Sequence, residues 1–382
     1  MSALLTLTAL PLAVALSSPD TVACWRVYVG SYAHGDEKGI HLLEFYPETG
    51  QLSLVGRAVE AESPSFLTLH PSQPILYAVG ESVQPEGIVS AYRIDAKAGS
   101  LRLINQQLSK GTAPCHLVVA PSEKHLALAN YSSGTVALFP ILENGGLAEA
   151  TSVIQHHGSS VNPQRQKGPH AHSVNFDAAG EHLYAADLGT DKMVIYQYDP
   201  DQGTLTPNEP PFVSLAPGAG PRHLTFHPSG HHAYVVNELD STVTAFNLDP
   251  KTGALNTIGS VSTLPDDYDG ESTTAEIRVH PTGKFLYASN RGHDSIAVFA
   301  LDPSTGMPKP IGRTPTGGKI PRNFNLDPAG RYLLAANQES DNVVVFRIDI
   351  ENGLLTPTGQ SLSVPKPVCV VFSPAPQSRQ ES

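Results

Sequence analysis

One pattern recurs along the chain, and this repetition limits the possible folds more than any other feature. In the clearest copy, residues 220–238, two apolar runs at 224–226 and 233–236 flank the turn-forming residues His227 to Gly230. Apolar runs separated by such residues predict a β-hairpin. Related turns occur six times, at intervals of 47 to 57 residues, at positions 70, 120, 177, 227, 280 and 327.

Each hairpin is followed by sequence for two further strands. After the clearest copy, residues 241–248 predict a third strand, residues 249–253 a turn and residues 254–258 a fourth strand. Four antiparallel strands in a unit of about 50 residues are typical of one blade of a β-propeller. The six repeats therefore predict six complete blades.

The two ends of the chain supply the parts of one more blade. Residues 26–32, 40–46 and 52–55 predict the second, third and fourth strands of a unit, whereas residues 368–372 predict an isolated first strand. Pairing of these fragments would close the ring and leave no free sheet edge. We therefore predict an all-β fold, a seven-bladed β-propeller with four antiparallel strands per blade, formed as a single domain by residues 24–374.

The sequence outside the repeats is short. Residues 1–23 begin with an apolar stretch, residues 3–16, whose length suits the apolar part of a secretory signal, although no Lys or Arg precedes it. We interpret residues 1–23 as a signal peptide of a periplasmic or secreted protein. The alternative is a disordered leader on a cytoplasmic protein. Residues 375–382 are polar and predict a disordered tail.

Charge and cysteine content exclude several function classes. The net charge is -12, and the 24 basic residues are spread thinly, which argues against nucleic acid or an anionic membrane surface as a partner. The three cysteines, Cys24, Cys115 and Cys369, form no CxxC pair and no zinc-binding spacing. We interpret them as buried apolar residues. An anionic ligand would have to be bound by a few local arginines.

Charged and polar residues gather at two positions of the repeat, the start of the first strand and the end of the second. The two strands form a hairpin, so both positions lie at the same mouth of the channel. The longest inserts, residues 156–167 and 263–273, enter first strands and belong to the same face. The residues at these positions are His170, His172, Arg222, Glu276 and Arg322, followed by Glu81, Asn130, Tyr131, Asp187, Asn237, Glu238, Asn290, Arg291, Asn337 and Gln338.

Structural roles are an open alternative for the charged residues. The hairpin brings Arg222 and Glu238 side by side, and this pair could be a buried ion pair that only stabilises the fold. Arg291 and Arg322 could form salt bridges between blades in the same way. The predicted mouth is nevertheless the default position for a ligand, because it collects charges of both signs.

The histidine and asparagine residues also have alternative interpretations. His170 and His172 lie two apart on an extended segment and point to one side, as in half of a metal site, but no third ligand follows at fixed spacing. The asparagines that end second strands recur in too many blades to be catalytic throughout, and they fit caps of local turns. These asparagines are at positions 130, 237, 290 and 337.

Six motifs in order resemble the lactonase family of seven-bladed propellers, which includes the propeller type of 6-phosphogluconolactonase and the fungal carboxy-muconate lactonizing enzyme. The resemblance covers residues 25–374. The motifs are Gly168 to Ser173, Gly220 to His223, Asn237 to Leu239, Ala275 to Ile277, Ser289 to Ile296 and Pro321 to Gln338.

The resemblance implies lactone opening or closing without a metal or other cofactor. It implies site residues at His170 or His172, Arg222, Glu238 and Arg291, and the repeat register favours His172. The expected partner is a small anionic lactone. We expect the propeller to act as a monomer.

Lactone opening needs a base for the attacking water and positive charge near the oxyanion. We expect Glu238 or His172 to be the base and Arg222 with Arg291 to bind the anion. Because Arg222 should lower the pKa of Glu238, His172, titrating near pH 7, is the stronger base candidate. The expected substrate-binding residues are His170, Glu276, Arg322, Asn337 and Gln338.

Two other functions fit the same mouth. The first is a cycloisomerase of the muconate type, in which the arginines bind a dicarboxylate and His172 or Glu238 delivers a proton to carbon. The second is a propeller without catalytic activity that binds a small ligand or a partner protein at its rim.

Overall fold

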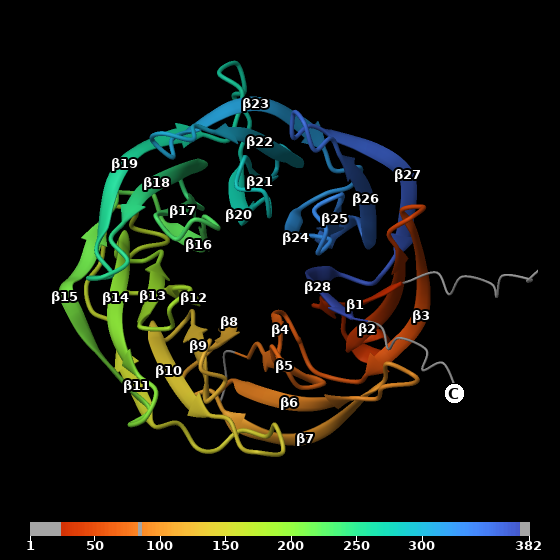
Figure 1. The fold of residues 1–382 in the computed structure, drawn as a ribbon, viewed down its shortest axis with the longest axis horizontal. Coiled ribbons are helices and arrows are strands. Elements are labelled where there is room, and N and C mark those ends of the chain that lie inside the picture. The colour runs from red at the N-terminus through yellow and green to blue at the C-terminus, as the bar shows by residue number, and fades with distance from the viewer. Residues whose placement is uncertain (1–23, 83–85, 375–382) are drawn as a thin grey trace, which may run out of the picture.

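The computed structural model describes residues 24–82 and 86–374, which form seven four-stranded antiparallel sheets arranged around a central channel (Figure 1). The predicted seven-bladed propeller is confirmed. The leader and the tail named above lie outside the described residues. The helical segments within the described part of the chain are two short 3-10 turns, η1 (Gly35–Glu37) and η2 (Gln338–Ser340), and no described helix could cross a membrane.

The strands of each blade run in order from the channel to the outer wall. They are β28 (Pro367–Pro374), β1 (Trp25–Ser31), β2 (Ile40–Tyr46) and β3 (Gln51–Val59); β4 (Leu67–Leu69), β5 (Ile75–Gly80), β6 (Ile88–Ile94) and β7 (Leu101–Leu108); β8 (Pro114–Val119), β9 (His125–Asn130), β10 (Thr135–Pro140) and β11 (Ser152–Gln155); β12 (Ala171–Phe176), β13 (His182–Asp187), β14 (Lys192–Asp199) and β15 (Thr204–Ser214); β16 (Pro221–Phe226), β17 (His232–Asn237), β18 (Thr242–Leu248) and β19 (Leu255–Ser262); β20 (Thr273–Val279), β21 (Phe285–Arg291), β22 (Ser295–Leu301) and β23 (Pro308–Pro315); β24 (Pro321–Leu326), β25 (Tyr332–Asn337), β26 (Asn342–Ile348) and β27 (Leu355–Ser363).

The ring closes through the blade that contains both ends of the described chain. Strand β28 pairs with β1 in antiparallel register, from Trp25 opposite Pro374 to Gly30 opposite Cys369. Figure 1 shows β28 at the channel, inside β1, β2 and β3. The predicted first strand at residues 368–372 and the predicted second strand at 26–32 are thus the two partners that complete the seventh blade.

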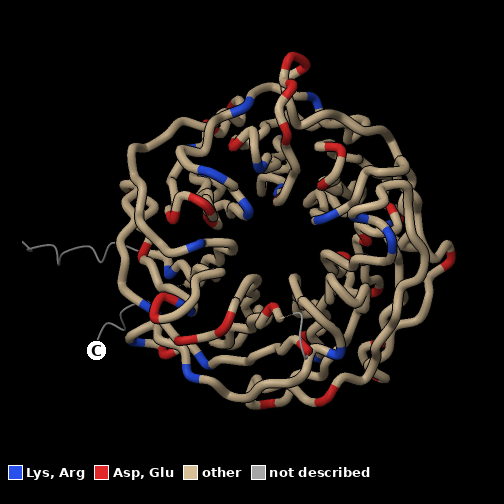
Figure 2. The backbone as a smooth tube through the Cα atoms, turned by 180° about the vertical axis from the view of Figure 1, so that it is seen from behind, with Lys and Arg blue, Asp and Glu red and all other residues tan. Residues whose placement is uncertain are grey.

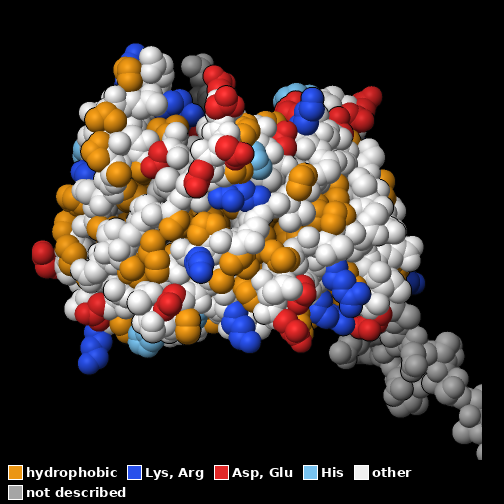
Figure 3. Space-filling view, turned by 90° about the horizontal axis from the view of Figure 1, so that it is seen from above, with side chains coloured by type: hydrophobic (Ala, Val, Ile, Leu, Met, Phe, Trp, Pro, Cys, Tyr) orange, Lys and Arg blue, Asp and Glu red, His pale blue; other side chains and the backbone are white. Residues whose placement is uncertain are grey.

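The core lies between neighbouring blades rather than inside one sheet. Second strands such as β5 and β25 are buried along their whole length, because a blade is covered on both faces. One interblade cluster packs Val27 and Phe45 against Tyr332 and Val345 of the preceding blade. The outer strands are exposed on one side. Figure 3 shows their apolar side chains spread over the outer wall between charged ones.

A repeated hydrogen bond also connects neighbouring blades. In five blades, a tyrosine of the second strand donates its buried hydroxyl to a glycine carbonyl in the outer turn of the next blade, at 2.7 to 3.0 Å. The glycines hold positive φ angles that favour glycine in a tight turn. The pairs are Tyr28 and Gly99, Tyr77 and Gly145, Tyr184 and Gly253, Tyr234 and Gly306, and Tyr287 and Gly353.

We predict that Tyr234→Phe lowers the free energy of unfolding by about 1–2 kcal/mol, because the Gly306 carbonyl loses its buried donor. Urea unfolding of the purified protein measures this change. Tyr268→Phe is the matched control, since its hydroxyl donates to the Glu271 carbonyl in an exposed position. Equal stability of the two variants would contradict a contribution from the interblade hydrogen bond.

Candidate active site

Irregular pairing at the start of the innermost strands directs side chains into the channel. The register between first and second strands shifts in six of the seven blades. In four of them the extra residue is a cysteine or a basic residue that directly follows a proline or an alanine. A β-bulge leaves its extra residue unpaired and changes the direction of its side chain. The residues in these four bulges are Cys115, His172, Arg222 and Arg322.

A second set of side chains comes from the ends of the second strands. Glu81, Tyr131 and Glu238 each directly follow such a strand, and Arg291 is the last residue of β21. The two sets enclose a cavity of about 270 Å³ at one mouth of the channel. Its lining residues are Glu81, Cys115, Tyr131, Arg165, His172, Glu238, Arg291 and Arg322.

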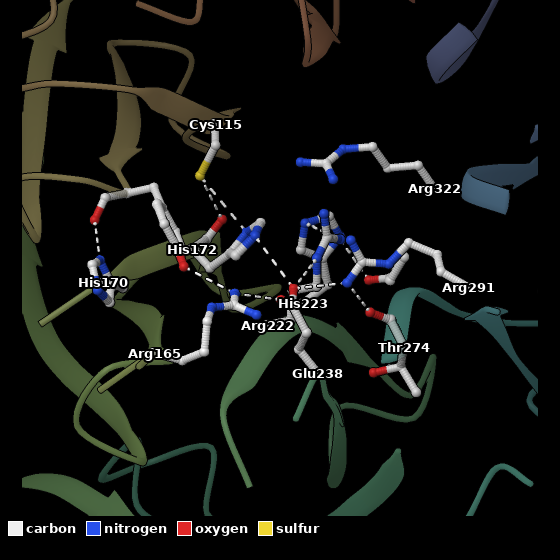
Figure 4. Close-up of polar contacts among 12 residues, drawn as sticks. Cys115, Arg165, His170, His172, Arg222, His223, Glu238, Thr274, Arg291 and Arg322 are labelled. Atoms are coloured by element: carbon white, nitrogen blue, oxygen red, sulfur yellow. Dashed lines mark hydrogen bonds and ion pairs between the residues drawn. The ribbon is translucent and has the colours of Figure 1, made fainter. Parts of the chain in front are cut away.

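Glu238 is the centre of the polar contacts in this cavity (Figure 4). Its Oε1 accepts a hydrogen bond from Nη2 of Arg165 at 2.6 Å. Its Oε2 lies 3.1 Å from Nε of Arg222 and 2.9 Å from Nη2 of Arg291. The expected contact of Arg222 with Glu238 is therefore present, but one carboxylate binds three guanidinium groups from three parts of the chain.

Backbone carbonyls hold two of these arginines in place. Arg222 Nη1 donates to the Ala275 carbonyl at 2.6 Å, and Arg291 Nη2 donates to the Thr274 carbonyl at 2.7 Å. The Nε group of Arg291 is buried and has no hydrogen-bond partner among the described residues. A buried donor without an acceptor is costly, so a ligand oxygen at this atom would be favourable.

Arg165 comes from the insert at residues 156–167, which was predicted to lie on the same face as the site. The neighbouring Gln166 is fully buried and donates to the Leu188 carbonyl and to Asp191, both at 2.8 Å. His156 lies between Asp187 and Tyr196, with both contacts at 2.6 Å. These contacts fix the insert that presents Arg165. The other long insert, residues 263–273, does not line the cavity.

Burial and charge set the protonation of the two expected bases. Burial by itself would raise the pKa of Glu238, but the charges of Arg291, Arg222 and Arg165 outweigh it and hold the pKa far below the ordinary range. Burial, followed by the charge of Arg222, lowers the pKa of His172 well below 6.5. The expectation that His172 titrates near pH 7 is therefore wrong, because it neglected the burial of this ring.

The side chain of His172 also lies near residues of the two neighbouring blades. Its Nε2 lies 3.9 Å from Glu238 Oε2, and its Nδ1 lies 3.7 Å from Cys115 Sγ. Burial raises the pKa of the Cys115 thiol, so the sulfur keeps its proton, and it donates to the His172 carbonyl at 3.3 Å. The site thus presents a neutral imidazole beside a carboxylate that stays ionised.

Four of the five expected substrate-binding residues lie outside the cavity lining, and only Arg322 belongs to it. His170 stacks on Tyr131 at 4.5 Å and contacts the Tyr131 carbonyl at 3.0 Å, so it supports a lining residue. Glu276 is buried deeper in the channel, where it contacts His223 at 3.2 Å and accepts a hydrogen bond from Asn323. His170 and Glu276 therefore lie behind the residues that line the cavity and hold neighbouring side chains in place.

Asn337 and Gln338 are also placed away from the cavity. Asn337 is fully buried and donates to the Thr316 carbonyl at 3.2 Å and to Asn342 at 3.1 Å. Gln338 donates to Glu339 at 2.9 Å. The hydrogen bond from Asn337 to Asn342, across the turn that contains η2, fits the alternative interpretation of the recurring asparagines as caps of local turns.

Several lining residues were not assigned to the site from sequence. Cys115 was interpreted as a buried apolar residue, although its position after Pro114 matches that of Arg222 after Pro221. Arg165 lies inside an insert, where the repeat register gives no position. Tyr131 and Glu81 lie at the predicted mouth position, directly after a second strand, but the sequence assigned them no role. The repeat register, applied to every blade, is the signal that finds all of these except Arg165.

The possible metal half-site at His170 and His172 is not completed by further ligands. Within residues 24–82 and 86–374, no group of three or more His, Cys, Asp or Glu side chains is arranged to hold a metal ion. The two rings also have separate surroundings, since His170 packs on Tyr131 and His172 faces the cavity.

The fold and the charged mouth define a seven-bladed propeller with a small-molecule site in its channel. The family description "Lactonase, 7-bladed beta-propeller" matches residues 26–372. The chain therefore belongs to this lactonase family, as the sequence motifs indicated.

Relatives of the chain match over most of their length. A protein of Bacillus subtilis (strain 168) named 6-phosphogluconolactonase is 40% identical over 345 residues, which cover 90% of this chain and 97% of the relative. A 6-phosphogluconolactonase of Formosa agariphila is 37% identical over 79% of this chain and 86% of the relative. The solved structure of a Pseudomonas aeruginosa periplasmic gluconolactonase has 33% identity and a TM-score of 0.88, with coverage of 93% and 100%.

We predict that Glu238→Gln lowers the free energy of unfolding at pH 7 by about 3 kcal/mol, because three arginines lose their shared carboxylate. The folded-state pKa of Glu238 is depressed, so its stabilisation is present above the ordinary value of 4.5 and is lost as the pH falls below it. Urea unfolding at pH 7 and pH 3.5 should show a smaller difference from wild type at the lower pH.

The exposed pair of Lys110 and Glu149 provides the control for this experiment. Glu149→Gln should change the free energy of unfolding by less than about 1 kcal/mol at both pH values. A Glu238→Gln variant as stable as Glu149→Gln would show that the arginine cluster does not depend on the carboxylate.

Proposed function

We propose that this protein hydrolyses a sugar-acid lactone, such as 6-phosphogluconolactone or a related aldonolactone, in the mouth of the propeller. The observation that carries this proposal is the concentration of arginines in the channel. Four guanidinium groups and two carboxylates line the cavity and the small void that adjoins it, in a chain whose net charge is -12. Figure 2 shows that many acidic positions lie on outer turns, away from the channel.

The arrangement suits the chemistry of lactone opening. Attack by water turns the carbonyl carbon tetrahedral and places negative charge on its oxygen, which fixed donors stabilise. Arg291 has a free buried Nε group and is held by the Thr274 carbonyl, so it needs little rearrangement to donate to this oxygen. Breaking the ring bond then yields a hydroxyl group and a carboxylate, and the carboxylate remains beside the arginines.

The relatives support the same proposal. Two proteins that share 37% and 40% identity with the chain are named 6-phosphogluconolactonase, and the Pseudomonas aeruginosa protein is named gluconolactonase. A phosphorylated lactone carries an anion that could bind a guanidinium group with two hydrogen bonds. A lactone without phosphate would use the same arginines for its carbonyl oxygen alone.

We predict that Arg291→Ala lowers kcat/KM for lactone hydrolysis by about 10²–10³-fold, the usual effect of removing one oxyanion donor. Hydrolysis of 6-phosphogluconolactone and gluconolactone, followed by release of acid in weakly buffered solution, measures this change. Arg102→Ala, which changes an exposed residue of β7, should keep wild-type activity. A wild-type protein that opens neither lactone would contradict the proposed function, and closure of a muconate ring would favour the cycloisomerase.

We also propose that residues 1–23 direct export of the protein. The support is the apolar stretch at residues 3–16 and the word periplasmic in the name of the Pseudomonas aeruginosa relative. The mass of the mature protein from its native host tests the proposal. Loss of the leader is expected, whereas a chain that still starts at Met1 or Ser2 would contradict a cleaved signal peptide.

A further inference from the structure

Glu81 is the second carboxylate that lines the cavity, and its environment differs from that of Glu238. The two residues occupy the same place in the repeat, directly after the second strand of a blade. Glu238 contacts three arginines, whereas Glu81 forms no ion pair with a basic side chain in the described part of the chain. Its Oε2 accepts a hydrogen bond from the hydroxyl of Tyr32 at 2.5 Å.

Tyr32 connects Glu81 to the remaining arginine of the cavity. Nη2 of Arg322 donates to the Tyr32 hydroxyl oxygen at 3.1 Å, and this hydroxyl donates onward to Glu81. The guanidinium of Arg322 also lies over the Tyr32 ring, 5.2 Å from its centre. In Figure 4, Arg322 lies apart from the arginines that contact Glu238. The cavity therefore has two separate polar sides, and Glu81 belongs to the side with fewer charged contacts.

A small void adjoins the cavity at Glu81. Its volume is about 10 Å³, close to the space that one water molecule requires. Glu81, Cys115 and Arg322 line both spaces, so the void and the cavity share these three residues as a common boundary. Ser65 also lines the void, is 5% exposed, and its hydroxyl has no hydrogen-bond partner among the described residues. A buried hydroxyl of this kind favours a bound water.

Neither residue expected from sequence is well placed to be the base. Both oxygens of Glu238 are bound to guanidinium groups, so protonation would break an existing ion pair. The imidazole of His172 is buried beside Arg222, a position that opposes a positive charge on the ring. Glu81 has no such contact with a guanidinium group and lies next to the polar void.

We propose that Glu81 is the general base of lactone hydrolysis and that the void bounded by Ser65 holds the water on which it acts. This inference rests on the proposed function. The water oxygen forms a bond to the lactone carbonyl carbon while one water proton moves to the Glu81 carboxylate. The ring carbon–oxygen bond then breaks, and the same proton moves from Glu81 to the leaving oxygen. The new carboxylic acid loses its proton to solvent, which restores the starting enzyme.

The test compares kcat of wild type, Glu81→Gln and Glu81→Ala on the lactone that wild type hydrolyses best. Glu81→Gln should lower kcat by about 10²–10⁴-fold, the range for loss of a general base, with KM changed less than threefold. Added formate should restore part of kcat in Glu81→Ala, because a small carboxylate can enter the space. A residue that only supports the fold would show no rescue by formate.

Two further variants keep the test decisive if Glu81 variants do not fold. Ser65→Val places methyl groups in the void and should lower kcat at least tenfold, while Glu149→Gln, an exposed change, should not alter it. A high-resolution crystal structure should show a water within hydrogen-bond distance of Ser65 and Glu81. Wild-type kcat in Glu81→Gln, or in Ser65→Val, would overturn the inference. Absence of wild-type activity on every lactone would instead overturn the proposed function.

Discussion

Pairing of β28 with β1 closes the ring, and the geometry of the site depends on this closure. A propeller blade buries its apolar faces only against its two neighbours, so every blade needs a partner on both sides. The cluster that joins Val27 and Phe45 to Tyr332 shows this packing at the closing blade. Because the ring is closed, side chains that lie far apart in sequence but in neighbouring blades, such as Tyr32 and Arg322, reach one another.

The packing of neighbouring blades also buries several charges in one place. Glu238 contacts Arg165, Arg222 and Arg291, and the balance of charge lets the buried groups of Glu238 and Arg222 stay ionised. Glu81 occupies the same repeat position with a different neighbour, the hydroxyl of Tyr32. The repeat thus places two carboxylates at equivalent positions, and their different partners suit them to different roles in the proposed reaction.

Much of the fold could be predicted because its signals are local. The turn at His227 to Gly230 and its relatives depend on neighbouring residues, and so does the contact of Arg222 with Glu238 across one hairpin. The partners of Arg165 and Glu276 could not be predicted, since they lie in other blades or in an insert. The protonation of His172 could not be predicted either, because it depends on how deeply the ring is buried.

The sequence by itself determined the strand order, the number of blades, the closing pair of strands and the face on which charged residues gather. Each of these follows from periodicity and from the geometry of one hairpin. Only the tertiary structure decided which residues of that face share a cavity. The β-bulges direct Cys115 and His172 inward, and the packing of the blades leaves Glu276 and Asn337 behind the lining. These outcomes depend on distances between blades, which no local pattern encodes.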